Sequence, residues 1–476
     1  MKRHLLLLAC LSVSSVAPAQ VMTTTSAIRD PEAGRPFVRN YSPKEYGAVD
    51  QNWTVLQDKR GVMYVGNNLG VLEYDGVAWR LIPVPNKTAI RSLAINDAGR
   101  IYVGAVGDLG YLAPDASGQM QFVSMLEQVP PDDRAFADVW RTYVTPQGIY
   151  FQTQSHLFRW ADGRMRVWKP TTRFNRAAVV DNRLYLTQVE HGLMELVDDE
   201  FKVLPGTERF GVEVHPVILP YGDGRLLIGT RADGLFLYDG TTATPFPTEV
   251  DELFRGGRLY RGLVLRDGRF ALATTGGGLA ILDHQGRRVQ VIDKSGGLRS
   301  DGVYYIHPDR QGALWLGMAS GIARVETPSP VTFYGEQSGI EGGVSGIIRH
   351  RGTLYITTEN GVQYLRPRPD TLQRGTASLQ WSEFRSDPAS RPSRGGSRPW
   401  TTSTAVAARR SWWPPRMAST RSTGTRRRSS GARSAGRSTR RCCCDRSRIR
   451  PACMSASSTA LRRCGAWVVD GSTRAA

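Results

Sequence analysis

Between Cys10 and Cys442 the 476-residue chain contains no cysteine. The remaining cysteines lie together near the C-terminus, at Cys442, Cys443, Cys444, Cys453 and Cys464. The long central part of the chain therefore has neither a disulfide nor a metal site built from thiolates. Its stability must come from packing and hydrogen bonds, over a length that suits roughly two to four domains.

The sequence also lacks the local motifs of several enzyme classes. Its seven His residues are scattered, with no H-x-x-x-H or H-E-x-x-H pair that could bind zinc from one face of a helix. There is no G-x-S-x-G, no G-K-[ST] loop and no D-x-D-x-D-G calcium loop. We therefore predict that the protein is not an enzyme and uses no metal or cofactor.

Long hydrophobic runs are missing as well, except for a short one at the N-terminus. Lys2 and Arg3 precede an apolar run from Leu5 to Val16, and residues 17–19 form an A-x-A cleavage site. This pattern predicts a signal peptide over residues 1–19 and export to the periplasm. Lipidation at the L-L-A-C segment, residues 7–10, is the less favoured alternative, because the apolar run before it is short. No later run is long enough to anchor the chain in a membrane.

Acidic residues are scarce at the C-terminal end, and this distribution changes the meaning of the net charge. The formal charge is +19, and residues 385–476 contain about 21 Arg, about three Asp and no Lys, Asn or Tyr. The chain before this tail is therefore almost neutral. A bulk-charge argument for nucleic-acid binding does not apply to the main body, and we expect no nucleic-acid partner.

Glycine is abundant, with 50 residues, and much of it recurs at regular intervals. The segment D-R-Q-G-A-L-W-L-G-M-A-S-G-I-A-R-V, Asp309 to Val325, indicates a turn, an apolar strand, a second turn and another strand. Related segments begin at Gln57, Asn96, Thr145, Asp181, Gly222, Arg266 and His350. The glycines of the second turn are Gly70, Gly110, Gly192, Gly234, Gly278, Gly321 and Gly361. Strand-and-turn repeats spaced by about 40 residues are typical of four-stranded propeller blades.

The order of the repeats predicts how the ring closes. Residues 37–47 precede the first unit, and residues 331–343 resemble them just before the unit at His350. An N-terminal strand commonly completes the last blade of a propeller. We therefore predict an all-β protein, with a seven-bladed β-propeller over 35–330 and the start of a second propeller over 331–384. A disordered or out-of-frame tail follows over 385–476.

The units resemble the two-component regulator propeller repeat, D-x-x-G-x-L-W-x-G-T-x-x-G-L. Asp309–Ile322 matches it nearly throughout, with Met318 in place of the usual Thr, and Gly222–Leu235 matches its second half. The resemblance covers about residues 35–370. It implies an exported ligand sensor whose relatives are membrane-anchored and dimeric. In such proteins a β-sandwich, a transmembrane helix and a cytoplasmic kinase, cyclase or DNA-binding output follow the propellers, and this chain contains none of them.

The tail has two interpretations. Its composition fits a disordered basic arm, but the Trp412-Trp413 pair and the Cys442–Cys444 triplet are unusual in such an arm. The composition is also typical of a GC-rich gene read out of frame. Residues 450–462, written in GC-rich codons and read from the third base, can give R-V-Y-V-G-L-F-D-G-V-A-A-L, which is another propeller unit. We favour this frameshift hypothesis, which makes the chain a truncated sensor.

The start of each blade's innermost strand contains the candidate binding residues. They are Arg91, Arg141, Arg176, His215, Arg261 and Tyr304. Converging guanidinium groups around a channel mouth would attract an anion, so we predict a small-molecule or oligosaccharide ligand of negative charge. Trp140, Phe174 and Tyr304 could stack on sugar rings. The simpler explanation is that Arg is common at exposed strand ends and that the aromatic rings pack in the core.

Two other functions stay open at this point. An exported polysaccharide lyase or hydrolase would need a carboxylate pair or a His/Tyr/Arg cluster at the mouth, and His215 with Tyr304 is the best candidate. A plain protein-interaction scaffold would need neither residue. The fold alone cannot distinguish these functions.

Overall fold

The protein is described here from a computed structural model. The structure describes residues 34–212, 217–231, 233–327, 331–366 and 383–387, all within the first unit of the chain, residues 1–395. The predicted signal peptide, His215 and the tail beyond residue 387 lie outside the described residues. The corresponding predictions therefore stay predictions.

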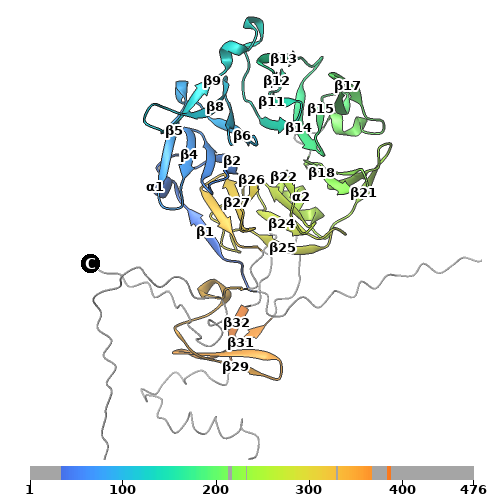
Figure 1. The fold of residues 1–476 in the computed structure, drawn as a ribbon. Coiled ribbons are helices and arrows are strands. Elements are labelled where there is room, and N and C mark those ends of the chain that lie inside the picture. The colour runs from blue at the N-terminus through green and yellow to red at the C-terminus, as the bar shows by residue number, and fades with distance from the viewer. Residues whose placement is uncertain (1–33, 213–216, 232, 328–330, 367–382, 388–476) are drawn as a thin grey trace, which may run out of the picture. The chain divides into compact units, whose positions relative to one another are not determined.

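The described chain forms eight four-stranded sheets, and seven of them surround a common centre (Figure 1). The innermost strands are β2 (Asn52–Gln57), β6 (Ile90–Ile95), β10 (Arg141–Thr145), β14 (Phe174–Val180), β18 (Val217–Gly222), β22 (Leu259–Val264) and β26 (Val303–Pro308). The second strands are β3 (Met63–Asn67), β7 (Ile101–Ala105), β11 (Gly148–Gln152), β15 (Arg183–Gln188), β19 (Arg225–Gly229), β23 (Phe270–Thr274) and β27 (Leu314–Met318).

The outer half of each sheet continues the same antiparallel order. The third strands are β4 (Gly70–Tyr74), β8 (Leu109–Pro114), β12 (Leu157–Ala161), β16 (Gly192–Val197), β20 (Leu235–Tyr238), β24 (Leu279–Leu282) and β28 (Ile322–Val325). The outermost strands are β5 (Trp79–Pro83), β9 (Met120–Ser124), β13 (Arg164–Trp168), β17 (Glu200–Val203), β21 (Ala243–Phe246), β25 (Arg288–Ile292) and β1 (Val38–Tyr41). Each innermost strand contacts the innermost strands of the next and the previous sheet, and β26 contacts β2. The chain is a β-propeller, as the repeats predict.

The ring closes by pairing the two ends of its chain. Strand β1 is antiparallel to β28, with Val38 opposite Val325 and Tyr41 opposite Ile322. The sheet β26–β27–β28–β1 therefore combines three strands from the end of the ring with one from its beginning. This is the closure that the position of residues 37–47 predicts.

The aspartate and tryptophan of the repeat motif stabilise the blade itself. The Asp309 carboxylate accepts the backbone N–H groups of Gln311 and Ala313, each at 2.9 Å. Its second oxygen accepts the side-chain N–H groups of Trp315 at 3.3 Å and Arg324 at 2.9 Å. The motif thus fixes a turn and connects it to two strands. These residues therefore have a structural role within the blade.

The glycine after the tryptophan allows neighbouring blades to approach closely. A Cβ atom on Gly317 would lie 3.0 Å from the backbone oxygen of Asn52 in the next blade. A Cβ atom on Gly66, at the matching position of β3, would lie 2.9 Å from the backbone oxygen of Ile90. A side chain at either position would push the innermost strands apart.

An aromatic cluster holds the closing strand. The ring of Tyr41 stacks on Trp315 at 5.3 Å between centroids, and it contacts Tyr74 and Trp79 edge-on, each at 5.5 Å. Tyr41 is 7% exposed. Since Trp315 belongs to the last blade and Trp79 to the first, one side chain of β1 joins both.

We predict that Tyr41→Ala destabilises the propeller by about 3–5 kcal/mol, the range for removing a buried aromatic side chain. The free energy of unfolding, measured with guanidinium chloride, checks this. Arg39→Ala is the matched control on the same strand, because the Arg39–Glu45 pair is exposed and should contribute at most about 1 kcal/mol. Equal unfolding midpoints for the two variants would contradict a stabilising role for the closing strand.

A buried histidine lies at the same junction. Nε2 of His307 on β26 accepts the backbone N–H of Gln57, at the end of β2, at 3.1 Å. Burial lowers the pKa of His307 to about 4. The imidazole is therefore neutral at physiological pH, as the hydrogen bond requires.

This histidine predicts a loss of stability in acid. An unfolded His has a pKa of about 6.5, so the unfolded chain takes up this proton first as the pH falls. The stabilisation is complete above pH 6.5 and falls by on the order of 3 kcal/mol as the pH drops to about 4. In His307→Gln, which keeps an acceptor, the free energy of unfolding should depend less on pH between 7 and 4.5. His284→Gln, at an exposed site, should follow the wild type, and identical curves for all three proteins would refute the assignment.

The eighth sheet follows the ring in sequence. It consists of β29 (Val344–His350), β30 (Thr353–Thr358), β31 (Gly361–Arg366) and β32 (Glu383–Ser386). Ile356, Leu365 and Phe384 form its small core, while Val344, Ile347 and Ile348 of β29 are exposed. Blades normally bury both faces against neighbours, so exposed apolar side chains fit the predicted start of a second propeller. Strand β32 includes the first two residues assigned to the tail.

Helices are few and short among the described residues. The α-helices are α1 (Pro43–Tyr46) and α2 (Asp251–Gly257). The 3₁₀ helices are η1 (Pro85–Lys87), η2 (Leu126–Gln128), η3 (Pro131–Asp133), η4 (Glu208–Gly211) and η5 (Glu336–Ser338). Within the described part of the chain, no helix has the length and apolar character needed to cross a bilayer.

Candidate functional site

Five of the six predicted site residues lie where the sequence places them, near the start of an innermost strand. They are Arg91 on β6, Arg141 on β10, Arg176 on β14, Arg261 on β22 and Tyr304 on β26. The sixth, His215, lies outside the described residues. Because the innermost strands are neighbours around the ring, these side chains come from successive blades to the same channel.

Aromatic rings line one side of the channel entrance. Trp53 of β2 stacks on Tyr304 with 4.9 Å between centroids, and Tyr304 contacts Tyr260 of β22 edge-on at 5.4 Å. Trp140, just before β10, contacts Trp53 at 5.9 Å. Phe174, the third candidate for stacking on a sugar, is fully buried and packs on Phe201 instead.

Arg91 differs from the other arginines because it has a carboxylate partner. Its Nε lies 2.5 Å from Oδ1 of Asp138, and its guanidinium lies 4.1 Å from the ring of Trp53 and 5.0 Å from that of Trp140. The positive charge is therefore neutralised and held between two indoles. Nη1 of Arg91 is nevertheless buried without a hydrogen-bond partner.

Arg141, Arg176 and Arg261 have no ion-pair partner among the described residues. Arg176 donates from Nη1 to the backbone oxygen of Tyr260 at 3.1 Å, and its Nη2 is buried without a hydrogen-bond partner. Arg141 donates from Nη1 to the backbone oxygen of Trp140 at 3.0 Å, and its Nε and Nη2 are buried without partners. Both side chains belong to residues that are only 4% exposed.

The electrostatics differ within this group, because neighbouring tyrosines raise the pKa of Arg261. Burial lowers the pKa of Arg141, and the charge of nearby Arg261 lowers it further. Burial also raises the pKa of Tyr260, although the surrounding arginines act in the opposite direction. A guanidinium group nevertheless stays protonated in proteins. The channel therefore contains buried positive charges with free donors, which is an arrangement that can bind an anion.

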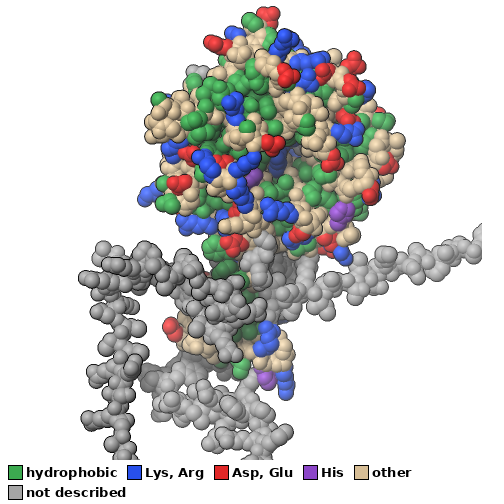
Figure 2. All heavy atoms as spheres, in the orientation of Figure 1, with side chains coloured by type: hydrophobic (Ala, Val, Ile, Leu, Met, Phe, Trp, Pro, Cys, Tyr) green, Lys and Arg blue, Asp and Glu red, His purple; other side chains and the backbone are tan. Residues whose placement is uncertain are grey.

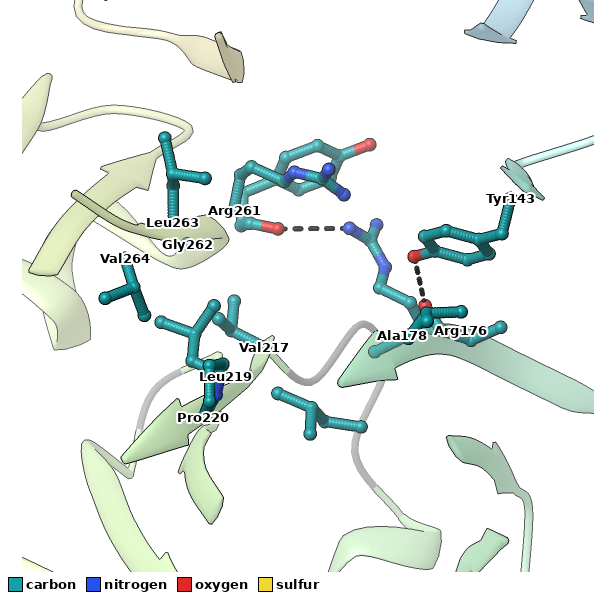
Figure 3. Close-up of a pocket in the computed structure, with 14 residues that line it drawn as sticks. Tyr143, Arg176, Ala178, Val217, Leu219, Pro220, Arg261, Gly262, Leu263 and Val264 are labelled. Atoms are coloured by element: carbon teal, nitrogen blue, oxygen red, sulfur yellow. Dashed lines mark hydrogen bonds between the residues drawn. The ribbon is translucent and has the colours of Figure 1, made fainter. Parts of the chain in front are cut away.

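A cavity of about 300 Å³ lies beside these arginines, between β10, β14, β18 and β22. Figure 3 shows Tyr143, Arg176 and Arg261 grouped along one side of it, with Val217, Leu219, Leu263 and Val264 along another. The hydroxyl of Tyr143 donates to the backbone oxygen of Ala177 at 2.8 Å. On the face of the ring in Figure 2, acidic and basic side chains are mixed, without a broad patch of one sign.

Several residues of this site are absent from the sequence-based prediction. Tyr143 lies two residues after Arg141, and Tyr260 immediately precedes Arg261, so strand register could have identified both. Trp53 occupies the matching start of β2. Asp138 lies in the irregular segment before β10, and no repeat pattern indicates that it pairs with Arg91.

A His–carboxylate pair elsewhere has a structural explanation. Nε2 of His156 lies 3.3 Å from Oδ1 of Asp133, and its Nδ1 lies 2.8 Å from Oγ of Ser155. Lys169 also pairs with Asp133 at 2.5 Å, and the imidazole stacks on Phe158. None of these residues lines the channel cavity. Among the described residues, no group of three or more His, Cys, Asp or Glu could hold a metal ion.

Comparison with known proteins supports the fold. No family model matches the sequence, and no curated protein matches it. Among solved structures, the extracellular domain of "the putative hybrid two component system BT3049" from B. thetaiotaomicron matches with a TM-score of 0.54 and 20% identity. The match covers 70% of this chain and 48% of that one. The propeller fold is confirmed.

Two further matches have TM-scores below 0.5. One is the extracellular domain of "the putative one component system BT4673" from B. thetaiotaomicron, with 17% identity and a TM-score of 0.49; the match covers 69% of this chain and 45% of that one. The other is virginiamycin B lyase from Staphylococcus aureus, with 12% identity and a TM-score of 0.47; the match covers 61% of this chain and 98% of that one. The BT3049 likeness agrees with the propeller fold that the repeats predict. This chain spans about half the length of that domain.

We predict that Arg141→Met raises the stability of the protein, by about 1–3 kcal/mol, because it removes a buried charge with unsatisfied donors. Chemical denaturation in the absence of ligand measures the effect. Arg225→Met is the control, because its partner Asp223 is exposed, and its loss should change stability by at most about 1 kcal/mol. A clear destabilisation by Arg141→Met would show that the guanidinium has partners that stabilise it.

Proposed function

We propose that the protein is the extracytoplasmic ligand-sensing propeller of a two-component-type signalling protein, and that its channel binds an anionic small molecule or oligosaccharide. The observation that carries this proposal is the pair Arg141 and Arg176, whose buried donors lack hydrogen-bond partners. Together with Arg261, they have no ion-pair partner among the described residues. The predicted signal peptide supports export to the periplasm.

The energetics of the arginine group favour a ligand rather than a structural role. A buried donor without a partner destabilises the folded protein, and like charges in the same channel repel one another. An anionic ligand would supply both the missing acceptors and the missing negative charge, with the planar, paired geometry that guanidinium prefers. Trp53, Trp140 and Tyr304 offer flat apolar surfaces at the entrance for the body of the ligand.

The position of the site suggests how binding could be communicated. Arg141, Arg176 and Arg261 come from β10, β14 and β22, which belong to different blades. A ligand that holds these three strands together binds one arrangement of the blades better than others. It therefore shifts the population toward that arrangement, which is the thermodynamic requirement for a sensor. A scaffold function would not require buried, unpaired charges in the channel.

We predict that tri-galacturonate raises the melting temperature of the full chain and that uncharged tri-galactose does not. The acidic trisaccharide can neutralise the arginines, and the neutral one cannot. Arg176→Met and Arg261→Met should each abolish the shift, whereas Arg166→Met, an exposed Arg on β13 with the same change of charge, should keep it. Thermal unfolding followed by fluorescence, with each sugar in turn, gives the measurement. Equal shifts with both sugars, or an unchanged shift in Arg176→Met, would count against an anion site in the channel.

A further inference from the structure

The cavity beside the arginines has a polar end and an apolar end. Its charged and hydroxyl groups, from Tyr143, Arg176, Tyr260 and Arg261, come from β10, β14 and β22. The rest of the lining is apolar and comes mostly from β18 and the second half of β22, with Val217, Leu219, Pro220, Leu263 and Val264. Figure 3 shows the two guanidinium groups on the opposite side from Leu219 and Pro220. A ligand that fits this cavity must therefore be amphipathic.

The capacity for hydrogen bonding is concentrated on the two arginines. Arg176 presents a buried Nη2 without a partner. The Tyr143 hydroxyl already donates its proton to the backbone oxygen of Ala177. Among the described residues that line the cavity, no side chain carries a carboxylate, an amide or an imidazole. The lining side chains can therefore satisfy a single anionic group well, and they offer little to a ligand with many hydroxyl groups.

Two kinds of anion fit the inside of this cavity poorly. A sugar acid could reach the arginines with its carboxylate while its rings stay at the channel entrance. Inside the cavity, its rings would bring several hydroxyl groups against Leu219, Leu263 and Val264, and each hydroxyl that loses water without a new partner weakens binding. An inorganic anion such as sulfate would satisfy the arginines but leave the apolar walls in contact with water. A carboxylate attached to an apolar body satisfies both ends, since it can accept from guanidinium groups while its body covers the aliphatic side chains.

We propose that the cavity binds a small monocarboxylate with an apolar body, such as a medium-chain fatty acid. The carboxylate lies between Arg176 and Arg261, and the body extends along β18 toward Leu263. A volume of about 300 Å³ is at the lower end of the range for small-molecule pockets, which limits the body to a short chain or a single ring. This inference rests on the proposed function, because it uses the same arginines, and it specifies the ligand class.

Titration calorimetry on the full chain with octanoate, at concentrations where it is monomeric, tests the proposal. Two probes separate the two ends of the ligand: octanol keeps the apolar body without the charge, and acetate keeps the charge without the body. We expect octanoate to bind and both probes to bind at least about tenfold more weakly, since each lacks one of the two contributions. Sulfate and galacturonate complete the series.

Variants connect the binding to the cavity. Arg176→Met should weaken octanoate binding at least about tenfold, because a hydrogen bond to a charged group is lost. Leu263→Asn, at a half-buried position, should weaken octanoate several-fold and leave acetate unchanged. Arg166→Met carries the same loss of charge outside the channel and should bind octanoate within about twofold of wild type. Thermal unfolding of each variant establishes that it is folded before its affinity is compared.

The outcomes distinguish the inference about the ligand class from the proposed anion-sensing function. Octanoate binding that depends on Arg176 and Leu263 supports this inference. Galacturonate binding that depends on Arg176, without octanoate binding, overturns this inference and leaves the anion-sensing function in place. Octanoate binding that is unchanged in Arg176→Met places the fatty acid elsewhere and overturns the inference. Failure of every anion to bind, with the variants folded, overturns the inference and the proposed function together.

Discussion

The pairing of β1 with β28 is the interaction on which the rest of the structure depends. It joins the two ends of the ring, so that the innermost strands of seven sheets face one channel. It adds strand pairing to the contacts between the first and last blades, which also include the packing of β2 on β26 and the hydrogen bond from Gln57 to His307. The side chains of Arg141, Arg176 and Arg261 are neighbours only because the ring holds their strands around a common centre. Closure is therefore a condition for both stability and the proposed binding.

The contrast between the repeat motif and the channel separates structural residues from functional ones. Asp309 satisfies four donors within one blade, and Trp315 packs beneath the closing strand. The contacts of such residues stabilise the folded blade. Arg141 and Arg176 are the reverse case, because they are buried with donors that the described residues leave unsatisfied. Under the proposed function, a ligand supplies the contacts that these side chains lack.

Much of the fold could be predicted from the sequence, because its repeats are local. Gly317 and Gly66 recur at the same position of their blades, and the spacing of the turns indicates four strands in each. The start of each innermost strand could be located in the same way, and this register predicts the positions of the arginines. The contacts between blades could not be predicted from the sequence, because they depend on which side chains meet across the channel. Asp138 neutralises Arg91 from an irregular segment, and Tyr260 meets Arg176 from two blades away.

The use of the first strand to complete the last blade also has a consequence for how the protein forms. Strand β1 leaves the ribosome first, yet its partner β28 is among the last parts of the ring to be made. Until then, both strands have an unpaired edge, and such edges invite association with other chains. Loss of a few residues at the beginning of the ring and loss of a few at its end both remove the pairing of β1 with β28. A propeller of this design is as vulnerable to trimming at its first strand as at its last.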